Sequence, residues 1–90
     1  MKSVFTIRQL DAWAEPDGGW TINDVFLLGT MTTTGNPKRA LMRFLKKKRI
    51  TFKRETIVIE DDMNFLTVCE KKTMCPLFYA ELEMRDECEN

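Results

Sequence analysis

One stretch of the chain, residues 36–49 (NPKRALMRFLKKKR), repeats its apolar side chains with helical spacing, and this single helix restricts how the rest can fold. Asn36 is a favourable N-cap, Pro37 suits the first helical position, and the helix should end near Arg49. The apolar stripe consists of Ala40, Leu41, Phe44 and Leu45. A stripe of this kind has to be buried against another element, so we expect the helix to pack on one face of a sheet.

The segments on either side of the helix are typical of strands. We predict strands over residues 3–14 and 20–33 before it and over residues 55–60, 65–70 and 77–83 after it. Turn chemistry between the first two predicts a hairpin, and the mixed apolar phase of the first strand indicates a bulge or burial on both faces. The later strands are short and turn-separated, which favours an antiparallel meander. The predicted fold is therefore α+β, in the order ββαβββ, with a curved antiparallel sheet and one amphipathic helix packed on one face.

The length of 90 residues fits one domain, which we place at residues 1–84, followed by an acidic tail at residues 85–90. The longest apolar run, residues 25–28, is far shorter than the roughly 20 residues that cross a bilayer. The first residues, MKSVFTIRQL, lack the apolar core of a signal peptide. We therefore expect a cytoplasmic protein without a membrane partner.

The residues that usually carry catalysis are scarce. The chain has no histidine, which removes the commonest general base near neutral pH and the commonest zinc ligand. Three cysteines, Cys69, Cys75 and Cys88, suit a reducing compartment, but none has a nearby basic partner in sequence to activate it. The acidic residues on the predicted turns and hairpin are Asp11, Asp17, Asp24, Glu60, Asp61 and Asp62. They lack the spacing of a calcium loop, so we expect no metal, no cofactor and no enzymatic activity.

The charge distribution is the sharpest functional signal. The net charge is zero, yet residues 38–54 hold nine lysines and arginines and no acid. The predicted partner-binding residues on and after the helix are Lys38, Arg39, Arg43, Lys46, Lys47 and Arg49. Together with one sheet edge, they fit an acidic protein surface, a nucleic-acid backbone, or simply a solvated face. The absence of interleaved aromatic residues and of a helix-turn-helix pattern disfavours the nucleic acid.

The two tryptophans bracket the turn of the predicted hairpin. Trp13 and Trp20 lie at equivalent distances from it, so we expect an aromatic cross-strand pair that stabilises the hairpin by about 0.2–1 kcal/mol. Their outer faces, with Asp17, form a second candidate binding surface, since tryptophan is enriched among interface anchors.

Five short motifs extend over nearly the whole chain: DAW (11–13), GGWTIND (18–24), LLG (27–29), RALMRFLKKK (39–48) and EKKTMCPLFYAEL (70–82). In these motifs the chain resembles a family of small phage- and prophage-borne proteins of Gram-positive bacteria. It departs from the family at Met74 and Cys75, where a turn residue such as glycine is usual, so the last turn should be atypical.

The resemblance implies a protein that acts in the bacterial host cytoplasm by binding and blocking a protein or ribonucleoprotein complex. Anti-CRISPR proteins, which inhibit CRISPR effectors, are the best-known small phage proteins that act this way. Two alternatives stay open: a regulatory protein that binds nucleic acid through the basic helix, and a homodimer joined through an open sheet edge.

Overall fold

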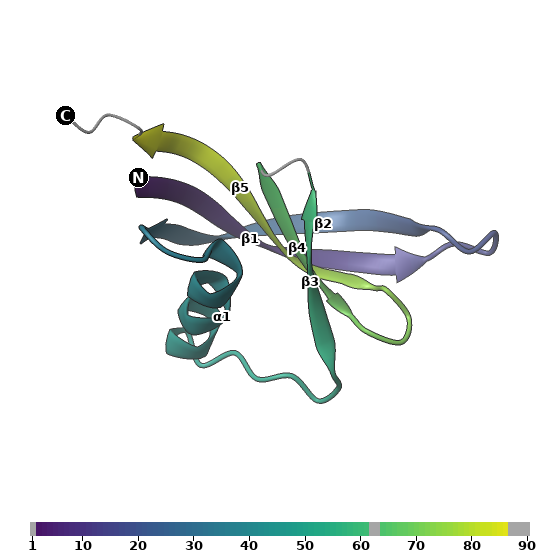
Figure 1. Cartoon of the computed structure of the whole chain (residues 1–90). Helices are drawn as coiled ribbons and strands as arrows, with labels where there is room; N and C mark the ends of the chain where they lie inside the picture. The colour runs from purple at the N-terminus through teal and green to yellow at the C-terminus, as the bar shows by residue number, and fades with distance from the viewer. Residues whose placement is uncertain (1, 62–63, 87–90) are drawn as a thin grey trace.

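The computed structural model describes residues 2–61 and 64–86, which form one antiparallel sheet of five strands and one helix (Figure 1). The elements are β1 (Lys2–Ala14), β2 (Trp20–Thr33), α1 (Pro37–Lys47), β3 (Thr56–Asp61), β4 (Phe65–Glu70) and β5 (Pro76–Asp86). The predicted α+β class and the order of elements along the chain are confirmed. No helix in the described ranges is both long and apolar enough to cross a membrane.

The strand order in the sheet, β2-β1-β5-β4-β3, differs from the order along the chain. The expected meander of β3, β4 and β5 is present, and β5 then pairs with β1 and so joins the meander to the hairpin. This arrangement leaves β2 and β3 as the two edges of the sheet. The strands of the hairpin cross the direction of β3 and β4 steeply in Figure 1, which shows the strong twist of the sheet.

The helix α1 begins and ends with defined caps. The Asn36 side chain accepts hydrogen bonds from the backbone N–H of Lys38 at 2.9 Å and of Arg39 at 3.3 Å, as the sequence predicts. At the other end, the Ile50 N–H donates to the Leu45 carbonyl at 3.1 Å, which is the hydrogen bond of a Schellman motif. Arg49 stands in the left-handed position of this motif, with a φ of 64°, although glycine usually occupies it.

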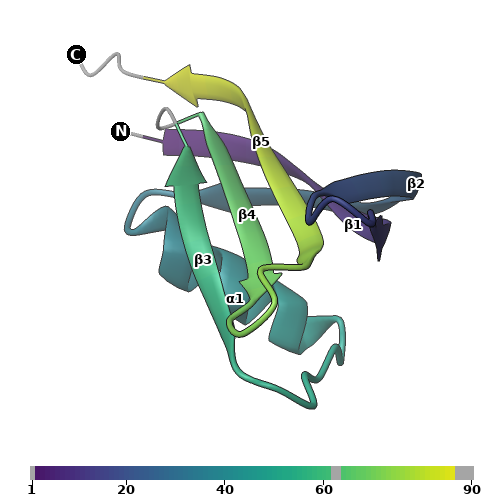
Figure 2. The same cartoon turned by 90° about the vertical axis from the view of Figure 1, so that its right-hand side faces the viewer.

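The core lies between α1 and one face of the sheet. Leu41 and Leu45 on the helix are almost fully buried, and Phe5 and Ile7 face them from β1. The remaining buried apolar residues of this cluster are Met31, Ala40, Leu66, Val68, Phe78 and Ala80. In Figure 2, α1 lies behind β3 and β4.

The hairpin of β1 and β2 extends beyond the rest of the sheet. β1 pairs with β5 only as far as Gln9, so the outer parts of the hairpin form a two-stranded ribbon that projects from the body (Figure 1). The pairing of β1 with β2 shifts twice, between Ile7 and Arg8 and between Asp11 and Ala12. In both shifts the extra residue lies in β2, so the predicted bulge is not in β1. β1 is instead buried on both faces, since the consecutive residues Phe5, Thr6 and Ile7 are all buried.

The prediction of a cross-strand pair between Trp13 and Trp20 was wrong. Trp13 lies opposite Thr21, and Trp20 lies opposite Ala14, so the two tryptophans occupy adjacent rather than facing positions. Because neighbouring residues of a strand point to opposite faces, Trp13 lies on the helix side of the ribbon and Trp20 on the other side. The turn Glu15–Gly19 instead holds itself together, with the Gly18 N–H donating to the Glu15 carbonyl at 3.0 Å.

The C-terminal strand differs slightly from its predicted bounds. β5 continues to Asp86, two residues past the predicted domain boundary, and residues 87–90 of the predicted tail lie outside the described residues. In the turn before β5, Met74 has a φ of 62°. This is the left-handed region that glycine adopts most easily, so a residue with a side chain is unusual at this position of the turn.

Candidate binding surface

The predicted cations of α1 lie on its exposed side. Within α1, Lys38, Arg39, Arg43, Lys46 and Lys47 are all exposed, and the apolar stripe points the other way into the core. Arg49, also exposed, is the second residue after the helix. We call these six residues, Lys38, Arg39, Arg43, Lys46, Lys47 and Arg49, the basic helix surface. Among the described residues, ion pairs involve Arg8, Arg54 and Lys71 but none of the six.

Two of these cations sit where the helix itself disfavours them. Lys38 and Arg39 occupy the first turn, which contains no acidic residue. A cation beside the positive end of the helix dipole costs roughly 0.3–1 kcal/mol, whereas Lys46 and Lys47 in the last turn are favoured by the negative end. The helix dipole alone accounts for the cations in the last turn, which the sequence pattern also predicts. The cations in the first turn, Lys38 and Arg39, say more about function, because the stability of the helix does not explain them.

A groove of about 530 Å³ runs between the first half of α1 and the edge strand β3. It is lined by Lys38, Arg39, Met42, Arg43, Ile57 and Val58. Three cations therefore form its rim, and Met42 with the two β3 residues supplies an apolar floor. The structure thus joins the basic helix surface to one particular sheet edge, which the sequence alone left undefined.

On its other side, α1 is fixed to β2 by an aromatic ring. Phe44 approaches Gly29 so closely that a Cβ on Gly29 would lie 3.5 Å from the Phe44 Cζ atom. The Lys48 ammonium lies 5.5 Å from the centre of the same ring. Phe44 thus packs against β2 and beneath the Lys48 ammonium, so its ring is not available to stack on a partner next to the cations.

The residues of the second predicted surface, Trp13, Asp17 and Trp20, do not lie together. Trp13 is 58% exposed on one face of the ribbon, Trp20 is half-buried on the other, and Asp17 accepts a hydrogen bond from the Gly19 N–H at 3.3 Å within the turn. The three side chains therefore do not converge on one partner-facing patch.

The structure shows instead an apolar strip on the sheet face that α1 does not cover. Its cross-strand neighbours are Leu10 with Val25, Ala12 with Ile22, and Arg8 with Leu27. Leu27 is 69% exposed. The sequence pattern missed this strip, because the two bulges change which residues of β2 share a face: Ile22 and Phe26, in one phase by sequence, lie on opposite faces.

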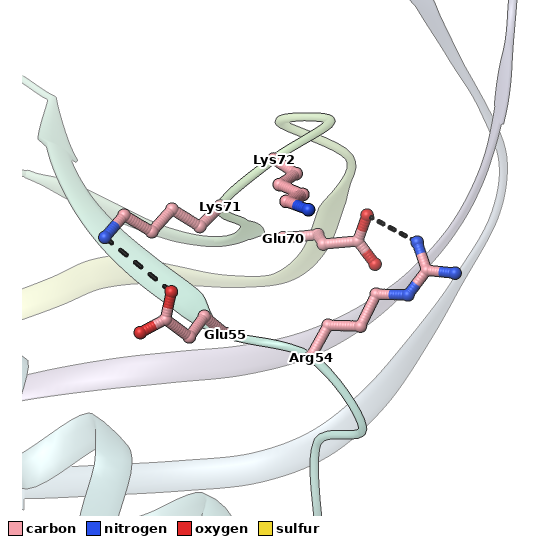
Figure 3. Close-up of a pocket in the computed structure, with 5 residues that line it drawn as sticks. All are labelled: Arg54, Glu55, Glu70, Lys71 and Lys72. Atoms are coloured by element: carbon pink, nitrogen blue, oxygen red, sulfur yellow. Dashed lines mark hydrogen bonds and ion pairs between the residues drawn. The ribbon is translucent and has the colours of Figure 1, made fainter.

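A polar cleft of about 510 Å³ lies near the base of β3 and β4 (Figure 3). Arg54 and Glu70 approach to 3.4 Å, and Lys71 and Glu55 to 3.7 Å, while Lys72 extends into the space between the pairs. Most of these side chains are exposed, so each pair stabilises the fold by about 0–1 kcal/mol. The charges are largely neutralised within the cleft, unlike those of the basic helix surface.

The thiols and carboxylates do not assemble into a reactive centre within the described ranges. Burial raises the pKa of the Cys69 thiol, with a smaller effect of Cys75, and burial likewise raises the pKa of Cys75, with a smaller effect of Glu70. Raised thiol pKa values disfavour the nucleophilic thiolate. No group of three potential metal-ligating side chains lies together there. Asp62 and Cys88 lie outside the described residues.

Comparisons with known proteins do not assign this arrangement to a known group. No protein-family model, curated protein or solved structure matches the chain at a significant level.

Proposed function

We propose that the chain is a non-enzymatic binding protein that occludes part of a bacterial protein or ribonucleoprotein complex through its basic helix surface. One observation carries the proposal: the six cations are exposed and unpaired among the described residues, and two of them stand at the end of the helix that disfavours them. Local rules broken without a local gain are typical of functional surfaces. Binding would block the partner sterically and neutralise its acidic groups.

The resemblance of the sequence to small phage and prophage proteins suggests which partner to test first. A host-defence complex, such as a CRISPR effector, is the natural candidate for a protein of this kind. The acidic sites of nucleases and the acidic faces of ribonucleoprotein assemblies have the charge that the basic helix surface complements.

A nucleic acid is the alternative partner, and the aromatic residues near the cations argue against it. Phe44 is packed on Gly29, and Phe52 meets the Phe78 ring edge-on at 5.9 Å between centroids. Neither ring is available to stack on a base, and stacking is the usual companion of phosphate contacts in single-strand binding. The proposal therefore favours a protein surface.

The test is an affinity pull-down from bacterial lysate with and without nuclease. The tagged protein is compared with the double variant Arg39→Glu/Arg43→Glu. The control is Lys2→Glu/Lys72→Glu, which changes the net charge equally but lies outside the basic helix surface and the groove beside it. Glutamate at position 39 suits the first helical turn, so the helix should persist, and circular dichroism checks this.

We expect a stoichiometric protein partner that survives nuclease, is retained by the control variant and is lost by the helix variant. Retention by the helix variant would show that the basic helix surface is not the binding site. Loss of all bound material on nuclease treatment would identify nucleic acid as the partner instead.

A further inference from the structure

We propose that the partner contributes an extended segment that adds to the sheet beside β3, with its acidic side chains facing Lys38, Arg39 and Arg43. This inference rests on the proposed function and names the chemistry of the partner. It follows from three features of the groove between α1 and β3: a free strand edge, an apolar floor and a basic rim at one end only.

The free edge supplies the backbone partners. Within the described ranges, β3 pairs only with β4, so its other side has no neighbouring strand. Alternate residues of such an edge point both N–H and C=O outward, where an added strand can bind them. Its six residues span about 20 Å, enough for a short extended segment.

The lining of the groove shows that it follows this edge. Ile57 and Val58 are consecutive in an extended strand and point to opposite faces of the sheet, yet both line the groove. A depression on one face of the sheet would contact only one of them. Met42 closes the floor from α1, so an apolar side chain of the added strand has three apolar neighbours.

The charges at the two ends of β3 define the polarity of the occupant. Lys38, Arg39 and Arg43 lie beside Ile57 and Val58, whereas Glu60 and Asp61, both exposed, end the strand. A segment with acidic residues near Val58 and a basic residue near Asp61 complements both ends. A nucleic-acid backbone, which is negative throughout, would be repelled where the strand ends.

The other edge of the sheet is less suited to an added strand. β2 carries two register shifts in its pairing with β1, whereas β3 pairs with β4 through six consecutive residues without a shift. Bulges bend and twist an edge and so hinder continuous pairing with a further strand. The regular edge is therefore the one beside the basic rim.

Fluorescently labelled peptides KTVTVDVE and EVDVTVTK test the inference, since they present the same charges in the two possible strand directions. Binding is measured by anisotropy, and protection of β3 amides by hydrogen exchange. We expect one peptide to bind and to protect alternate β3 amides. Arg43→Glu should weaken it about tenfold, whereas Lys72→Glu, the same charge change in the β4–β5 turn, should not. N-methylation at alternate peptide residues should abolish binding.

Several outcomes would overturn the inference. They are binding of neither peptide, binding without β3 protection, displacement of the peptide by single-stranded oligothymidine, and self-association through β3 in sedimentation experiments. The proposed function fails separately, in the pull-down. A protein partner that is lost by Arg39→Glu/Arg43→Glu but does not protect the β3 amides would support the proposed function and refute strand addition.

Discussion

Gly29 of β2 lies beside Phe44 of α1 in a backbone conformation that favours glycine, and replacing Gly29 by alanine tests that conformation. Gly29 has a φ of 147°, a conformation that residues with a side chain rarely adopt. Forcing alanine into it costs about 1–3 kcal/mol. The new methyl group itself adds little, because 3.5 Å to Phe44 is an ordinary van der Waals distance. The loss therefore comes from the backbone.

The restricted unfolded chain of an alanine variant offsets roughly 0.4–1 kcal/mol of that cost. We therefore expect Gly29→Ala to destabilise the fold by about 1–2 kcal/mol, which for a domain of this size lowers Tm by roughly 5–15 °C. Urea unfolding at equilibrium and thermal unfolding followed by circular dichroism both measure the change.

Gly35→Ala is the matched control. Its Cβ would meet nothing within 4 Å, and its φ lies outside the left-handed region. Alanine should therefore be neutral there or stabilising by up to about 1 kcal/mol. If Gly29→Ala and Gly35→Ala unfolded at the same urea concentration, the backbone conformation described for Gly29 in β2 would be wrong.

Two further predictions concern single residues. Arg49→Gly should stabilise the fold by about 0.5–1 kcal/mol in urea unfolding, because Arg49 holds a left-handed φ of 64°, whereas Lys48→Gly, at a φ of −77°, should destabilise it. An Arg49→Gly variant no more stable than wild type would contradict this. Burial, and then Glu81, raise the pKa of Tyr79, although Arg8 lowers it. Tyr79 is the only tyrosine, so ultraviolet titration should show that it ionises at a higher pH in the folded protein than in the unfolded chain. The contribution of this group to stability is complete below about pH 10 and is lost as the pH rises through the folded pKa. Identical titrations of folded and unfolded protein would refute that environment.

Local patterns predicted the elements because each depends on a few neighbouring residues. Asn36 and Pro37 define where α1 begins, and the turn chemistry around Gly18 separates β1 from β2. The basic face of the helix was equally predictable from the sequence, because apolar and basic residues at this helical spacing lie on opposite faces. For the same reason, the six residues of the basic helix surface could be named before the fold was known.

The tertiary structure decided what depends on distant pairings. The insertion of β5 between β1 and β4 left β3 as an edge, and the position of α1 beside that edge brought Met42, Ile57 and Val58 into one groove. The turn pairs Ala14 with Trp20 and so separates Trp13 from Trp20, and the two bulges placed the residues of the apolar strip on one face. Sequence alone determined which segments form strands and where the cations lie on the helix. Which strand edge meets those cations depends on long-range burial and register, which no local pattern encodes.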